Sequence, residues 1–121
     1  MKKAVLGALF LASLPIHAQE VPKGKWVEAM KTAIPAYFCQ EAQYFRQCFN
    51  VTVTECEEVA ASATRICLND LNPQIPNMLV QPRDGTLWGN KVGTCAGTAY
   101  ETTLREKRIS NKKCNNVSNW K

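Results

Sequence analysis

Sulfur chemistry is the first chemistry that this chain offers, because it contains six cysteines and an even number of thiols can pair completely. No two of them stand in a C-x-x-C arrangement, which argues against the clustered thiolates of a zinc site. We therefore expect three disulfides, no metal and no cofactor. The six residues are Cys39, Cys48, Cys56, Cys67, Cys95 and Cys114.

A cleavable export signal is predicted over residues 1–18. Lys2 and Lys3 form a positive start, residues 4–14 are apolar, and Ala18 supplies the small residue before a cleavage point. The apolar run is far shorter than the roughly 20 residues that span a bilayer. We expect a periplasmic or secreted protein with no transmembrane segment after cleavage and a single domain over residues 19–121. Export also favours disulfides over free thiols.

Loss of this segment removes the only histidine, His17. Catalytic dyads and triads that use an imidazole base, and zinc sites that use histidine, are then excluded. Carboxylates remain, and Glu41 and Glu101 are the pair best placed for glycosidase-type chemistry. Both also fit exposed helix surfaces, so no catalytic residue is predicted and the protein is expected not to be an enzyme.

Binding chemistry is concentrated in residues 72–93, which are rich in proline and glycine. Trp88 lies there close to Arg83 and Asp84, and tryptophan and arginine are common anchors of protein interfaces. We predict Arg83, Asp84 and Trp88 as binding residues. The alternative is that Trp88 only covers a small core, and that the segment has no function of its own.

The elements that must position these residues are mainly helical. The spacing of apolar residues predicts helices over residues 22–34, 35–49, 55–71 and 94–108. Thr54 with Glu57 predicts the start of the third helix as a capping box, and Ile66 is expected on its buried face. Between the third and the fourth predicted helix, the sequence Pro82-Arg83-Asp84-Gly85 predicts a turn that joins short strands at residues 78–81 and 86–88.

The second and third helices, joined by a short loop, predict a central antiparallel hairpin. Within such helices Cys39 and Cys48 would lie about 13.5 Å apart, and Cys56 and Cys67 about 16.5 Å apart. Disulfides need Cα atoms within about 7 Å, so both pairings are excluded. Among the remaining pairings we expect Cys48–Cys56 near the turn of the hairpin, Cys39–Cys67 at the end of the hairpin away from its turn, and Cys95–Cys114 in the C-terminal part. The fold class is thus a small, mainly α domain of three or four helices stapled by three disulfides.

Charge is unevenly distributed over the chain, which has a formal net charge of +5. The segment from Arg105 to Lys121 contains six basic residues and one acidic residue, Glu106. Such a segment can make weak contact with an acidic surface, or it can simply keep the end of the chain in water. Nucleic acid is not an expected partner.

These observations favour an exported, non-enzymatic protein that binds another exported or envelope protein, in its most specific form an inhibitor or immunity-type protein. Two alternatives stay open. One is a small secreted hydrolase that uses carboxylates on the cell envelope, and the other is a structural or assembly subunit of an envelope complex.

Overall fold

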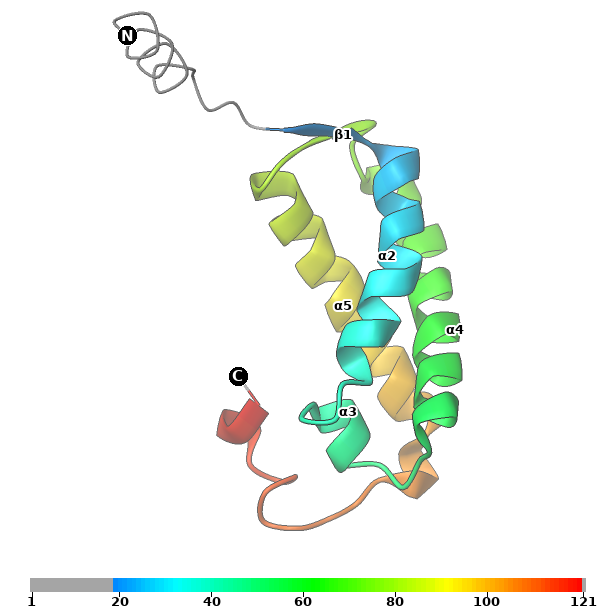
Figure 1. Cartoon of the computed structure of the whole chain (residues 1–121), viewed down its shortest axis with the longest axis vertical. Coiled ribbons are helices and arrows are strands. Elements are labelled where there is room, and N and C mark those ends of the chain that lie inside the picture. Colours follow the sequence, from blue (N-terminus) through cyan, green and yellow to red (C-terminus); the bar gives the residue numbers. More distant parts are fainter. Residues whose placement is uncertain (1–18, 121) are drawn as a thin grey trace, which may run out of the picture.

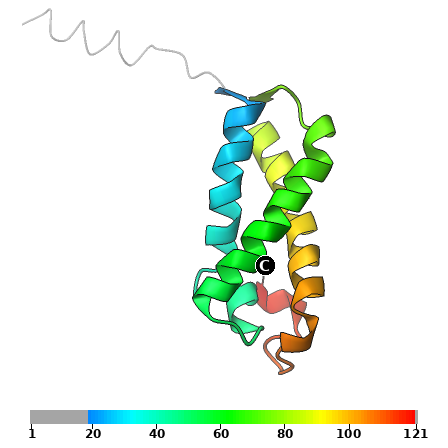
Figure 2. The same ribbon diagram turned by 90° about the vertical axis from the view of Figure 1, so that its right-hand side faces the viewer.

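The structure, a computed structural model, describes residues 19–120. The predicted export signal, residues 1–18, lies outside the described residues. Three long helices run past one another in alternating directions: α2 (Lys23–Phe38), α4 (Val53–Leu71) and α5 (Arg83–Thr103). The helix α4 packs against both α2 and α5 (Figures 1 and 2). The expected fold class, a small, mainly α domain stapled by disulfides, is confirmed.

The central antiparallel hairpin is formed by α2 and α4, one element earlier than predicted. Pro35 does not separate two helices but lies buried inside α2, which continues to Phe38. The true break comes at residues 39–43, where the Arg46 guanidinium donates to the carbonyl of Cys39 (2.9 Å). Only a short helix, α3 (Tyr44–Gln47), remains of the predicted helix over residues 35–49.

The helix α4 begins at Val53, and its cap is Thr52 rather than Thr54. The Thr52 hydroxyl accepts from the amide of Glu55 at 3.1 Å, which satisfies one of the free donors of the first turn. The sequence offers two overlapping capping boxes, because a glutamate follows both threonines at a distance of three residues. Glu55 instead pairs with Lys107 at 2.7 Å, so it ties α4 to the chain beyond α5.

The prediction of a loop with a β-hairpin over residues 72–93 is wrong. The strand β2 (Met78–Val80) pairs antiparallel with β1 (Glu20–Pro22), with Val21 opposite Leu79. Residues from Arg83 onward form α5, which is eleven residues longer at its N-terminus than the predicted helix over 94–108. A buried stripe explains this helix despite its glycines, because its side chains recur every fourth residue on one face. The stripe is Trp88, Val92, Ala96 and Tyr100.

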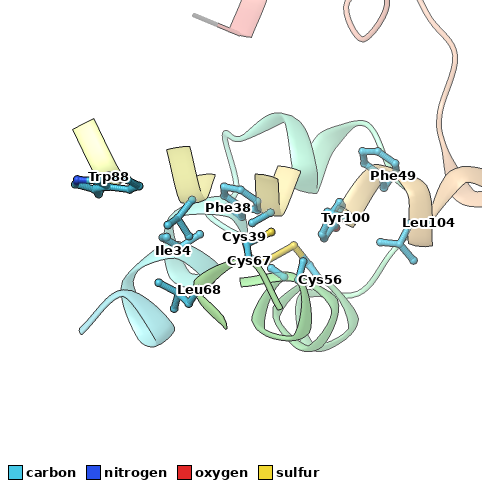
Figure 3. Packing of buried hydrophobic residues seen from close by; sticks show 14 of the residues in the cluster. Ile34, Phe38, Cys39, Phe49, Cys56, Cys67, Leu68, Trp88, Tyr100 and Leu104 are labelled. Atoms are coloured by element: carbon cyan, nitrogen blue, oxygen red, sulfur yellow. A yellow bond between two sulfur atoms is a disulfide. The ribbon is translucent and has the colours of Figure 1, made fainter. Parts of the chain in front are cut away.

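Aromatic rings fill the lower part of the core, where α2, α3 and α5 converge (Figure 3). Phe38 stacks on Phe45 with ring centroids 4.1 Å apart, and Tyr100 meets Phe45 and Phe49 edge-on at 5.0 and 5.2 Å. Gly97 makes this close approach possible, because a Cβ atom there would lie 3.2 Å from the Phe45 ring. The core therefore continues along α5 into the region that holds α3 in place.

The three disulfides join Cys39 to Cys56, Cys48 to Cys114 and Cys67 to Cys95. All three expected pairs are wrong, although neither of the two pairings excluded by distance occurs. The error follows from the displaced hairpin: Cys39 ends α2, which pairs with α4, whereas Cys48 ends the short helix α3. The second bond ties the C-terminal segment to the end of α3, and the third joins α4 to α5.

Among residues 19–120, no helix is both long enough and apolar enough to cross a membrane.

Reduction should unfold the protein or lower its melting temperature strongly. Each disulfide is expected to contribute about 2–4 kcal/mol to the free energy of unfolding in a domain whose core is this small. Calorimetry of oxidised and reduced protein measures the difference, and non-reducing peptide mapping should recover the three pairs above. Equal melting temperatures, or a different set of pairs, would contradict this framework.

Gly93→Ala should stabilise the protein by about 0.5–1 kcal/mol, because alanine favours the helix and a Cβ atom at Gly93 meets nothing within 4 Å. Gly97→Ala is the matched control. It gains the same helical preference but presses on the Phe45 ring, so it should be less stable than Gly93→Ala. Urea unfolding of the two variants makes the comparison, and equal gains in both would show that Gly97 is not needed for packing.

Candidate functional site

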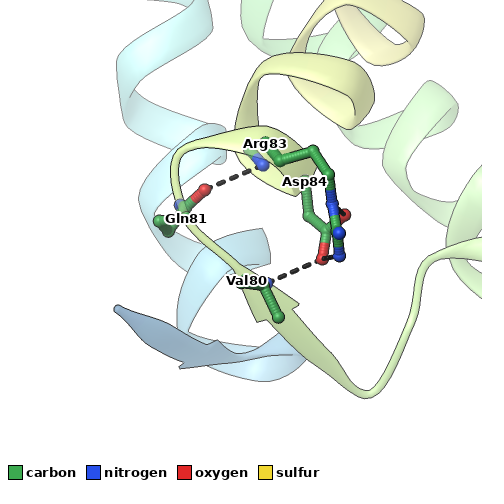
Figure 4. Close-up of polar contacts among 5 residues, drawn as sticks. Val80, Gln81, Arg83 and Asp84 are labelled. Carbon is green, nitrogen blue, oxygen red and sulfur yellow. Dashed lines mark hydrogen bonds and ion pairs between the residues drawn. The ribbon is translucent and has the colours of Figure 1, made fainter. Parts of the chain in front are cut away.

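Arg83 and Asp84, two of the predicted binding residues, lie in the first turn of α5 (Figure 4). The Asp84 carboxylate accepts from the amide of Val80 at 2.7 Å and from the Arg83 guanidinium at 3.1 Å. The Gln81 side chain accepts from the amide of Gly85 at 2.8 Å. The Arg83 guanidinium, followed by the Val80 amide, holds the pKa of Asp84 below its usual range. These contacts fasten β2 to the start of α5.

Trp88, the third predicted binding residue, is buried in the core with 8% of its surface exposed. The ammonium group of Lys91 lies 5.1 Å from the centroid of its ring. The structure therefore does not bring Trp88 to the same surface as Arg83, whose side chain is three-quarters exposed. The alternative considered above, that Trp88 covers a small core, describes its place in the fold.

Leu87 and Ile66 are two large apolar residues on the surface, 47% and 54% exposed. They flank a groove of about 820 Å³ along the seam between α4 and α5. The Cys67–Cys95 disulfide joins the two helices at this groove, so its width is fixed covalently. Between the two apolar residues the lining includes Leu71, Thr94, Thr98 and Ala99.

A second hollow of about 220 Å³ continues this groove toward the start of α4 and shares Ile66 and Ala99 with it. Its lining adds mostly small side chains: Val59, Ser62, Ala63 and Thr103. From Glu58 to Leu71 the two hollows follow α4 for roughly 20 Å, given the rise of a helix. We call this surface the seam groove.

Charges lie at both ends of the seam groove. Glu58 and Asp70 on α4 are exposed and line it, and neither forms an ion pair within the described residues. Lys91 on α5 is the one basic residue of the lining, and its ammonium group is placed over Trp88. The groove is thus an apolar channel with a carboxylate near each end.

Sequence reasoning missed both apolar residues of the seam groove. Ile66 was expected on the buried face of its helix. The helix α4 packs on α2 and on α5, but the side chain of Ile66 is not covered by either helix and stays 54% exposed. Leu87 was hidden by the wrong strand assignment of residues 86–88. A helical reading of α5 would have placed Leu87 beside Lys91 and Thr94 and away from the stripe of Trp88.

The groove offers apolar contact area. Residues 19–120 contain no group of three or more His, Cys, Asp or Glu side chains that could hold a metal ion. Glu41 lies in the turn between α2 and α3, and Glu101 lies on α5 away from this groove. What the seam groove can do is bury apolar side chains of a ligand between two rigidly joined helices.

Asp84→Asn should destabilise the protein at neutral pH, because it removes the negative charge that Arg83 and the Val80 amide stabilise. A carboxylate whose pKa is lowered in the folded state contributes stability above its unfolded pKa of about 3.9, and this is lost as pH falls through the folded value. The melting temperatures of the two proteins should therefore differ at pH 7 and converge in strong acid. A constant difference at all pH values would contradict this role.

Comparisons with known proteins place the chain in a family. Neither the search of curated proteins nor that of solved structures returned a match. The sequence model of one family, described as T2SS substrate NttA, matches residues 20–108, which include all of α2, α4 and α5. The chain therefore belongs to the NttA family of type II secretion system substrates and is an exported protein.

Proposed function

We propose that this exported protein is a non-enzymatic binding protein whose seam groove holds an amphipathic helix of a partner protein. The observation that supports it best is the exposure of Ile66 and Leu87 on either side of a groove of about 820 Å³. A partner could bury these two side chains together with the apolar lining of the groove between them. In its most specific form the partner is an exported or envelope protein that this chain masks, as an inhibitor or immunity-type protein does.

A helix is the occupant that the shape of the groove favours. A helix laid along the α4–α5 seam would pack on two helices at once, as neighbouring helices of a bundle do. The floor contains Ser62, Ala63 and Ala99, and small side chains allow two helices to approach closely. The groove length corresponds to a helix of about 13 residues, enough for apolar anchors at positions i, i+3 or i+4, and i+7.

The carboxylates specify the charge of that helix. Glu58 and Asp70 are separated by twelve residues on α4, or about 18 Å along its axis. A partner helix lying along α4 would meet both with lysine or arginine residues about eleven or twelve positions apart. The proposed partner segment is therefore an amphipathic helix with an apolar face and a basic residue near each end of it.

Photocrosslinking tests this proposal directly. A photoreactive phenylalanine analogue at Ile66 should crosslink a partner from envelope or secreted extracts, and mass spectrometry should map the crosslink to an amphipathic helix with basic residues. The same analogue at Tyr37, which is 57% exposed on α2 away from the seam groove, is the matched control and should not give this product.

Ile66→Asp should lower affinity for the crosslinked partner at least about tenfold, since it puts a charge into the apolar contact. Tyr37→Asp should leave affinity unchanged, and thermal melting of both variants reports on the fold. Crosslinks that are equal at both positions, or that map to a loop or strand of the partner, would overturn the assignment of the groove.

A further inference from the structure

A second concave surface lies at the other end of the molecule, between α3, the last turns of α5 and the C-terminal segment. In Figure 1 this is where the 3-10 turn Val117–Trp120 lies beside α3. Its volume is about 500 Å³. The Cys48–Cys114 disulfide holds the C-terminal segment against the end of α3, so the walls are joined covalently. The seam groove shares no residue with it.

A chain of hydrogen bonds orders the polar side of this pocket. The Arg108 guanidinium donates to the Tyr44 hydroxyl at 2.9 Å, and that hydroxyl donates to Glu101 at 2.7 Å. The pKa of Tyr44 is raised, mainly by burial and secondly by the neighbouring Glu101, so the phenol stays a neutral donor. Arg108 also donates to the carbonyls of Ile109 and Cys114. One carboxylate oxygen of Glu101 is thereby oriented, and the other has no hydrogen bond within the described residues.

Aromatic rings form the apolar side. Tyr44 and Trp120 meet edge-on with centroids 5.6 Å apart, and Phe45 lies next to Tyr44 at 5.2 Å. The indole nitrogen of Trp120 donates to the carbonyl of Lys113 at 3.2 Å, which fixes the orientation of the ring. Val117, which is 77% exposed, completes the wall. The pocket thus combines fixed ring surfaces with an oriented carboxylate.

A neighbouring hollow of about 390 Å³ shares Glu101 and Arg108 with this pocket. Its lining adds Phe49, the hydroxyl residues Thr98 and Thr102, and the exposed guanidinium of Arg105, and Thr98 also lines the seam groove. The two hollows together form a two-lobed surface with Glu101 at the junction. The first lobe presents the rings of Tyr44 and Trp120, whereas the second presents mainly polar side chains, because Phe49 is buried with 2% of its surface exposed.

The charges around Glu101 disfavour a cationic ligand. The lining holds two guanidinium groups, those of Arg105 and Arg108, against this one carboxylate, so a cation would meet a net positive charge. A ligand with an apolar face and many hydroxyl groups fits the lining, because ring C–H groups pack on aromatic rings while hydroxyls donate to a carboxylate and accept from guanidinium groups. Sugar rings have this chemistry.

We propose that these two lobes form a binding site for a neutral oligosaccharide, with one sugar ring against Tyr44 and Trp120 and a hydroxyl group on Glu101. The site binds its ligand without hydrolysing it. Glycoside hydrolysis requires two carboxyl groups about 5–9.5 Å apart, and Glu101 is the single carboxylate of the lining. Glu41, the expected partner of Glu101, is not part of either lobe.

Titration with defined sugars tests the site. The oxidised, secreted protein is mixed with neutral tetrasaccharides (N-acetylated chitotetraose, cellotetraose, maltotetraose and mannotetraose), and NMR follows the three indole N–H signals. At least one neutral sugar should shift the Trp120 signal at millimolar concentration or below, while the signals of the buried Trp26 and Trp88 stay in place. Deacetylated chitotetraose, which is cationic, should bind at least about tenfold more weakly than that neutral sugar.

Two variants localise the binding. Glu101→Gln keeps the size of the side chain but removes its charge, and Trp120→Ala removes the ring; each should weaken the sugar about tenfold or more. Ile66→Asp, in the seam groove, should have no effect, so failure here is independent of the proposed partner helix. Absence of binding by every neutral sugar, equal binding of the cationic sugar, or unchanged affinity in both pocket variants would overturn the proposal.

Discussion

The structure depends on the burial of Tyr100, which leaves none of its surface exposed. Its hydroxyl donates to the carbonyl of Phe45 at 2.8 Å, and its ring is enclosed by Phe38, Phe45 and Phe49. Burial raises the pKa of Tyr100 to about 12, so the phenol remains a donor throughout the physiological range. One side chain of α5 thereby satisfies a carbonyl of α3 and anchors the short helix that carries Tyr44.

The disulfides divide the molecule into regions of different rigidity around that anchor. Cys67–Cys95 joins α4 and α5 at the floor of the seam groove, and Cys39–Cys56 joins the end of α2 to the first turns of α4. Cys48–Cys114 is different, because the segment it fastens packs on the helices with few buried side chains. The seam groove is therefore built on the core itself, whereas the two-lobed surface depends on a tethered segment.

The class of the fold could be read from the sequence, but its boundaries could not. The stripe of α4 and the even number of cysteines predict a stapled helical domain, and Thr52 and Thr54 locate the start of α4 to within two residues. Residues 83–93 were misassigned because they follow Pro82 and contain three glycines, while the evidence for a helix is tertiary: Trp88 and Val92 are buried in the core. Because of that error the candidate site was missed as well. Leu87 and Ile66 can be recognised as the two sides of one groove only when α5 is known to lie beside α4.

The order of the disulfides along the chain bears on how the protein reaches its folded state. Cys48 lies inside the loop that Cys39–Cys56 closes, and its own partner, Cys114, is the last cysteine of the chain. A chain oxidised in the order in which its cysteines leave the membrane would join Cys39 to Cys48 first, and that bond would then have to be exchanged. Such reshuffling takes seconds to hours depending on the oxidant and isomerase, so the yield of native protein depends on α2 and α4 pairing before oxidation or on an isomerase in the compartment that receives the chain.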